Sequence, residues 1–170
     1  MVWPSAPVSS DLMLAERLVL ALLLSGLIGL ERELHRTSVG LRTHALVGTL
    51  AALFMTLAEV MIERFGAGSS VIKLDPLAVL GATVSGISFL GAGAIIASST
   101  TERRQSLTSA ASILGSAGVG LCCGLERYLL GAVLTALLLL ILHGFRVVEV
   151  RLLRTHDPEV PDRHPDPPEH

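Results

Sequence analysis

Between residues 29 and 47 the sequence reads GLERELHRTSVGLRTHALV, which gathers charge between two apolar segments. Its ionisable side chains are Glu31, Arg32, Glu33, His35, Arg36, Arg42 and His44. Carboxylates that retain water are typical ligands of Mg²⁺, whereas a glutamate beside an arginine forms an ion pair. Arginines that follow a membrane span also hold a loop on the cytoplasmic side. The stretch is therefore a topology signal, a working site, or both.

Acidic residues near the ends of the apolar segments are the candidates for binding a cation. Glu31 and Glu33 stand two positions apart, so they do not share one face of a helix. Each has an arginine close by, and from the residues alone we favour glutamate–arginine pairing over a shared cation. Glu59 and Glu63 lie about one helical turn apart. The weak candidates for ligands of a bound Mg²⁺ are Glu31, Glu59 and Glu63.

The composition is that of a membrane protein. The chain has 170 residues, of which 51% are hydrophobic and 16% charged, and its mean hydropathy is +0.63. A soluble domain carries about 25% charged residues, so the deficit favours a chain that lies in the lipid bilayer. A net charge of −2 and an aromatic content of 4% argue against nucleic acid as a partner.

Five apolar segments are each long enough to cross a bilayer as a helix, which takes about 20 residues. None shows the alternation of apolar and polar residues that a strand would have. We therefore predict an all-α, polytopic bundle of five transmembrane helices. The predicted spans cover residues 12–30, 43–62, 77–96, 107–125 and 128–148.

Lysine and arginine predict the orientation, because they accumulate in cytoplasmic loops. With the N-terminus outside, the inner parts of the chain hold nine of these 13 residues. We therefore predict an N-out, C-in topology, with residues 1–11 as a short extracytoplasmic N-terminus. Residues 149–170 form a predicted cytoplasmic tail, disordered because it is rich in Pro, Asp and His. No basic residue precedes Arg17, so we expect no cleaved signal peptide.

Small residues recur at helical spacing in three of the spans and predict where helices pack. The stripes are His44, Gly48, Ala52 and Thr56; Ser112, Ser116, Gly120 and Gly124; and Ser85 and Gly93 around Phe89. Small side chains at this period let helix backbones approach closely. We therefore expect the second, third and fourth spans to form the core of the bundle. Packing explains such stripes more simply than a path for a substrate does.

Nothing in the sequence indicates an enzyme, since no nucleotide-binding, zinc-protease or serine-hydrolase motif occurs. Cys122 and Cys123 are adjacent in an apolar run and are expected to be small apolar fillers. His143 lies about one turn from the inner end of the fifth span, where an interfacial role is expected.

The motifs resemble those of the MgtC/SapB family of bacterial membrane proteins. The resemblance rests on GLERE at 29–33, GLRTHALVGTLAALF at 40–54, VSGISFLGAGAII at 84–96 and LTSAAS at 107–112. It implies a protein of the bacterial inner membrane that is linked to low magnesium and to intracellular survival, with a role in virulence. The chain is similar to a short member that lacks the soluble C-terminal domain of longer ones.

By this resemblance, function is expected at the residues that match the family motifs. They are Glu31, Arg32, Glu33, Arg42, Thr43, His44, Ser85, Gly86, Gly91, Gly93 and Thr108. The sequence departs from the common pattern at Ser88, where Gly is usual, and at Leu114, where Trp is usual. Ala78 and Ala82 stand where many members carry Arg and Gln.

Three functions are consistent with these observations. The first is a regulatory module that contacts a membrane partner, for which the resemblance suggests the F-type ATP synthase. The second is a magnesium or proton conduit, built from several copies because five helices make a small bundle. The third is a scaffold without a ligand. No cofactor is expected beyond an unproven Mg²⁺.

Overall fold

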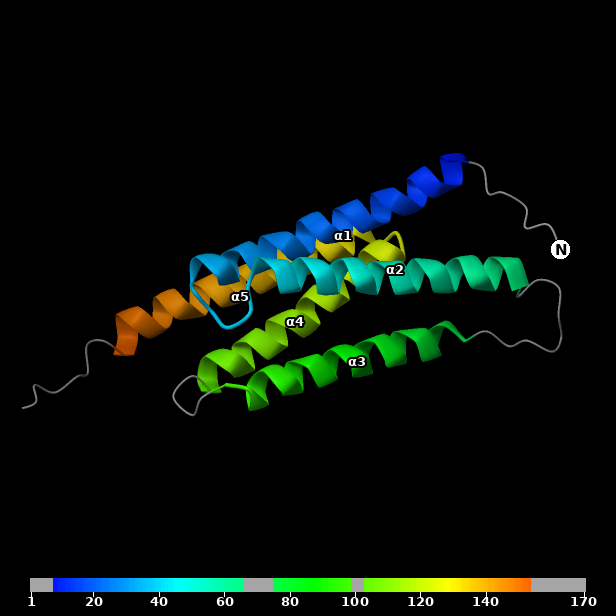
Figure 1. Ribbon diagram of the computed structural model, residues 1–170. Coiled ribbons are helices and arrows are strands. Elements are labelled where there is room, and N and C mark those ends of the chain that lie inside the picture. The colour runs from blue at the N-terminus through cyan, green and yellow to red at the C-terminus, as the bar shows by residue number, and fades with distance from the viewer. Residues whose placement is uncertain (1–7, 66–74, 99–102, 154–170) are drawn as a thin grey trace, which may run out of the picture.

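The fold comes from a computed structural model that describes residues 8–65, 75–98 and 103–153. It consists of five α-helices: α1 (Val8–Leu34), α2 (Leu41–Phe65), α3 (Pro76–Ile96), α4 (Arg103–Gly124) and α5 (Tyr128–Leu153). Successive helices run in opposite directions along the bundle (Figure 1). The described residues contain no strand, so the predicted all-α class is confirmed.

The helices have the length and composition that a bilayer requires. Four stretches are long and apolar enough to cross a membrane: Asp11–Leu34, Leu41–Glu63, Pro76–Ile96 and Ser106–Gly124. In α5 the apolar stretch is Tyr128–Gly144, and the helix itself continues beyond it. The chain is therefore a multi-pass membrane protein.

The helix ends differ from the predicted boundaries by a few residues. Helix α1 begins at Val8, so part of the predicted N-terminal segment is helical. Helix α5 continues to Leu153, which places residues 149–153 in a helix and not in the predicted tail. The remaining predicted tail, residues 154–170, lies outside the described part of the chain.

The core lies between α1, α2 and α4, which corrects the expectation that the second, third and fourth spans would form it. The core residues of α1 include Ala21, Ser25 and Ile28, each fully buried. Helix α3 has two buried residues, Thr83 and Gly91. The prediction failed because several small residues of α3, namely Gly81, Gly86 and Gly93, have no neighbour within 4 Å of an added Cβ. Figure 1 shows α3 along its outer side.

Close backbone contact between α2 and α4 confirms the small-residue stripes on these two helices. A Cβ atom at Gly120 would collide with the Gly48 carbonyl oxygen and lie 2.9 Å from its carbon. At Gly124 it would lie 2.8 Å from the Ala52 carbonyl oxygen. Real Cβ atoms essentially never approach so closely. Glycine at these positions therefore sets the distance between the two helix axes.

Two helices end in the same hydrogen-bonded turn. After α1, the Thr37 and Arg36 amides donate to the carbonyls of Arg32 (3.2 Å) and Glu33 (3.0 Å). After α4, the Arg127 and Glu126 amides donate to Cys122 (2.8 Å) and Cys123 (3.0 Å). Arg36 and Glu126 take the left-handed position of this turn, with φ of 52° and 58°. The turns therefore position charged side chains at both ends of the bundle.

Candidate functional site

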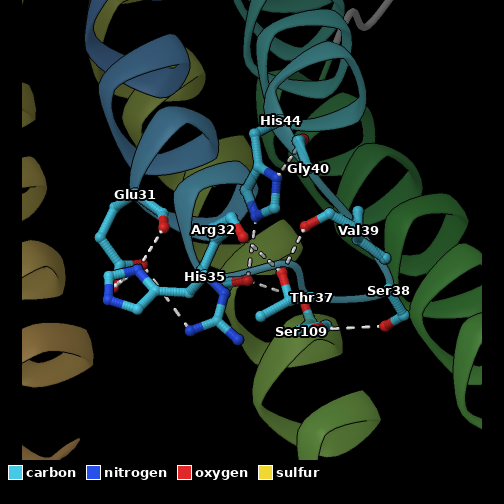
Figure 2. Close-up of polar contacts among 10 residues, drawn as sticks. Glu31, Arg32, His35, Thr37, Ser38, Val39, Gly40, His44 and Ser109 are labelled. Atoms are coloured by element: carbon cyan, nitrogen blue, oxygen red, sulfur yellow. Dashed lines mark hydrogen bonds and ion pairs between the residues drawn. The ribbon is translucent and has the colours of Figure 1, made fainter.

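His44 is the centre of a buried polar cluster near the start of α2. The imidazole is fully buried, and its Nδ1 lies 2.8 Å from the Gly40 carbonyl oxygen. A carbonyl only accepts, so Nδ1 carries a proton and donates it. Nε2 lies 2.9 Å from the Ser112 hydroxyl, which also lies 2.8 Å from the Ser109 carbonyl oxygen. Figure 2 shows His44 above Ser109 in this cluster.

The Ser112 hydroxyl has one proton and two acceptors within reach. It donates to Nε2 when the imidazole is neutral, or to the Ser109 carbonyl when Nε2 is protonated and donates to it. The protonation state of His44 therefore determines which of the two acceptors the Ser112 hydroxyl of α4 donates to. Two family-motif segments, GLRTHALV and LTSAAS, meet at this hydrogen bond.

The His44–Ser112 contact should stabilise the bundle measurably. Ser112→Ala leaves a buried ring nitrogen without a partner, and we expect it to lower the free energy of unfolding by about 1–3 kcal/mol. Ser88→Ala is the control, because Ser88 is exposed and its hydroxyl donates to the Val84 carbonyl of its own helix. Denaturant titration in mild detergent measures both variants. Equal stability of the two variants would contradict a specific His44–Ser112 bond.

Glu31 lies in the last turn of α1, among other polar side chains. Its side chain is 11% exposed, and Arg32 Nη1 approaches one carboxylate oxygen to 3.7 Å. Both carboxylate oxygens are buried and accept no hydrogen bond within the described residues. His35 Nδ1 lies 2.7 Å from the Glu31 carbonyl oxygen and 3.2 Å from its carboxylate. Glu31 is therefore paired with an arginine, which the structure shows to be Arg32, but this pair leaves the carboxylate incompletely satisfied.

Glu33 has a different role from Glu31. Its carboxylate accepts a hydrogen bond from the Leu41 amide at 3.0 Å, and this amide is one of the free donors at the start of α2. A Cβ at Gly40 would collide with the same carboxylate. Glu33 thus caps α2, a role that the sequence did not predict. A hollow of about 450 Å³ beside it is lined by Glu33, Gly40, Leu41, Arg42 and Thr43.

A second charged cluster lies at the other end of the bundle. Arg17 of α1 forms ion pairs with Glu59 of α2 and Glu126 of the α4–α5 turn. It also donates to the Gly124 carbonyl oxygen at 2.9 Å. The Arg17 side chain is 9% exposed, against 38% for Glu59 and 57% for Glu126. One buried guanidinium therefore ties three helices and a turn together.

The expected site residues divide between these clusters and the surface. Arg32, His44 and Gly91 are buried. Exposed in the bundle are Glu33, Arg42, Thr43, Ser85, Gly86, Gly93 and Thr108. Glu59 and Glu63 lie toward the far end of α2 from Glu31, so the three acidic metal candidates do not form one site.

Sequence reasoning missed three features of these clusters. The pairing of Arg17 with Glu126 joins residues more than a hundred positions apart. His35 and His143 meet edge to face, with ring centroids 6.3 Å apart. Ser112 was assigned to a packing stripe, yet it bonds His44. The available signal was that His44 and Ser112 each begin a small-residue stripe in spans predicted to pack together.

The helix bundle and its two terminal polar clusters define a class: a multi-pass, all-α membrane protein. Comparison with protein families then identifies the family within that class. The model of the MgtC family matches residues 18–151, and the chain belongs to this family. The resemblance noted in the motifs is thereby confirmed.

Several curated proteins are similar to the chain. "Putative magnesium transporter YhiD" of Escherichia coli K12 is 34% identical over 141 residues, which are 81% of this chain and 62% of that protein. "Protein MgtC" of Salmonella typhimurium is 39% identical over 111 residues, 65% of this chain and 43% of that protein. An uncharacterized protein of Haemophilus influenzae is 33% identical over 130 residues, 76% of this chain and 54% of that protein.

The chain therefore spans less than two thirds of the length of these relatives. No solved structure matches it significantly.

Proposed function

We propose that this protein is a magnesium-linked regulatory module of the inner membrane, which acts by helix contact with a membrane partner. The link to magnesium rests on the family resemblance and on the name of the relative from Escherichia coli. The proposal of helix contact rests on the outward face of α3. It is tested at that face.

The observation that carries the proposal is the contrast between two sets of glycines. At Gly29, Gly48, Gly120 and Gly124, an added Cβ would collide with a neighbouring helix or the turn before it. At Gly81, Gly86 and Gly93 of α3, nothing lies within 4 Å of an added Cβ. Each glycine inside a helix costs about 1 kcal/mol relative to alanine. The described chain gives no contact that offsets this cost on α3.

A transmembrane helix of another protein could pack closely against these glycines of α3, as α2 and α4 pack against each other at Gly48 and Gly120. The exposed face of α3 carries Gly81, Ser85 and Gly93, and Ser85 offers a hydroxyl for a bond across the contact. In lipid, apolar surface alone does not drive association, whereas small residues allow close backbone packing. A partner transmembrane helix with small residues fits this face better than lipid does. The family resemblance makes a membrane subunit of the F-type ATP synthase the first partner to test.

The closed centre of the bundle supports contact with a partner over conduction by one protomer. Between the two polar clusters, the backbones of α2 and α4 touch at Gly48 and Gly120. A space that does not admit one methyl group does not admit a hydrated Mg²⁺, which gives up its water reluctantly.

A proton conduit remains the second candidate, and one observation favours it. The hydroxyls of Thr56 and Ser116 are buried without a hydrogen-bond partner among the described residues. Thr56 belongs to α2 and Ser116 to α4, two helices of the core. An assembly of several copies could use such hydroxyls, or surfaces between copies, to pass protons or magnesium.

Photo-cross-linking in membranes tests the proposed contact. A photoreactive residue is placed at Gly93 on α3, and the matched control replaces Leu137, which is 50% exposed on α5. We expect Gly93 to cross-link to a membrane subunit of the ATP synthase, identified by mass spectrometry, and Leu137 to give lipid adducts. Lipid adducts from both positions would contradict the proposal. Cross-links from Gly93 to a second copy of this chain would favour the conduit instead.

A further inference from the structure

We propose that Glu31, His35 and His143 form a binding site for a divalent transition metal ion of the Zn²⁺ type. Each residue offers one ligand atom, and these three atoms all lie within 4.8 Å of one another. Glu31 and His35 come from the end of α1 and the turn after it, and His143 comes from α5. This inference is independent of the proposed contact at α3.

The donor set determines the class of metal. Two imidazoles and one carboxylate are typical ligands of Zn²⁺ and other first-row divalent ions. Mg²⁺ prefers oxygen ligands and keeps several waters. This cluster therefore differs from the magnesium sites that the acidic residues suggested. With three protein ligands, at least one coordination position stays open to water.

A hydrogen bond already orients one of the three ligands, His35. The Nδ1 of His35 donates to the Glu31 carbonyl oxygen at 2.7 Å, which leaves the lone pair on Nε2. Such a bond to a backbone carbonyl is the usual support for a metal-bound histidine. Figure 2 shows Glu31 and His35 together, with the backbone bond between them. His35 follows Glu31 by four residues, about one helical turn. It stands directly before Arg36, which has φ of 52° in the turn that ends α1.

The Glu31 carboxylate provides a second, independent indication of a ligand. Both its oxygens are buried and accept no hydrogen bond from any described residue. Its ion-pair contacts are long, with His35 Nδ1 at 3.2 Å from one oxygen and Arg32 Nη1 at 3.7 Å from the other. A buried carboxylate without such partners is costly. A bound cation would satisfy it, with the exposed His143 as the ligand from α5.

The site would also join α5 to α1. Without a bound metal, the described contact between His35 and His143 is an edge-to-face approach of the two rings, with an interplanar angle of 69°. Metal binding would replace this contact by bonds of about 2 Å to a shared ion. We therefore expect bound metal to make the protein more resistant to thermal unfolding, because it binds the folded state alone.

Metal titration of the purified full chain in nanodiscs tests the site, with Zn²⁺ followed by calorimetry and Co²⁺ by visible absorption. The tail histidines His156, His164 and His170 would bind metal themselves, so all are replaced by Gln in the parent protein. We expect one equivalent of Zn²⁺ to bind. His143→Ala should weaken binding at least about tenfold and leave the fold intact, because His143 is exposed.

Two further variants make the test specific. Glu31→Gln should weaken binding by a similar factor, and its fold is checked by circular dichroism. Glu33→Gln is the control, because it removes a carboxylate of the same loop that lies outside the cluster; its affinity should equal that of the parent. Three results would overturn the site: no binding once the tail histidines are replaced, parent-like affinity of His143→Ala, or displacement of Zn²⁺ by equimolar Mg²⁺.

Discussion

Gly120→Ala should destabilise the bundle by about 1–3 kcal/mol, because the added methyl group collides with the backbone of α2. The methyl would meet the Gly48 carbonyl, and backbone has no alternative rotamer to adopt. The helices must separate, which also weakens the buried contacts of Ala51 and Ala117 beside them. Among the described glycines, Gly120 would bring an added Cβ closest to the backbone of a neighbouring helix.

Gly93→Ala is the matched control for this substitution. The two positions have the same chemistry, a glycine inside a transmembrane helix, but Gly93 has open space around it. Alanine there should stabilise the isolated protein by up to about 1 kcal/mol through helix propensity. Unfolding in mild detergent with added sodium dodecyl sulfate measures both variants. If they shift stability in the same direction, the close packing of α2 and α4 is wrong.

Arg17→Met should be the most damaging change of a single charged residue. It leaves Glu59 and Glu126 without their cation and removes a donor from the Gly124 carbonyl. Breaking a fully buried pair costs about 3–5 kcal/mol, and exposed pairs contribute at most about 1 kcal/mol. The two carboxylates are partly exposed, so we expect a loss of about 2–3 kcal/mol.

A double-mutant cycle separates the ion pairs from the packing of the arginine stem. Glu126→Gln should cost less than about 1 kcal/mol, because Glu126 is more than half exposed. In the Arg17→Met background the same change should cost nothing, or relieve repulsion between the unpaired acids. Additive losses in the cycle would mean that Arg17 stabilises the bundle by packing alone.

Much of the fold could be predicted from hydropathy. The helices at Leu41–Phe65 and Pro76–Ile96 begin within two residues of the predicted spans, and Asp75 caps the latter by accepting from the Leu77 amide at 2.9 Å. Hydropathy could not predict which of the helices are buried in the core of the bundle. The middle of α1 and nearly all of α3 are apolar, and in lipid apolar surface does not show which side meets protein.

The candidate site was predictable in location but not in its pairings. The charged loop was expected to be important, and His44 does lie buried at its end. Its partner Ser112 lies 68 positions away, and spacing along the chain does not show such contacts. Glu33 is a second example. An arginine is adjacent in sequence, yet its carboxylate accepts a hydrogen bond from the Leu41 amide, eight positions away at the start of α2.

Magnesium uptake into proteoliposomes that contain only this protein tests the central claim most directly. A trapped magnesium-sensitive dye reports entry, with and without an imposed membrane potential, and circular dichroism verifies the fold. The account predicts the same dye signal as in protein-free liposomes, because the protein acts through a partner. Uptake above that level, lost in Glu31→Gln, would contradict it and make the charged loop part of a permeation path.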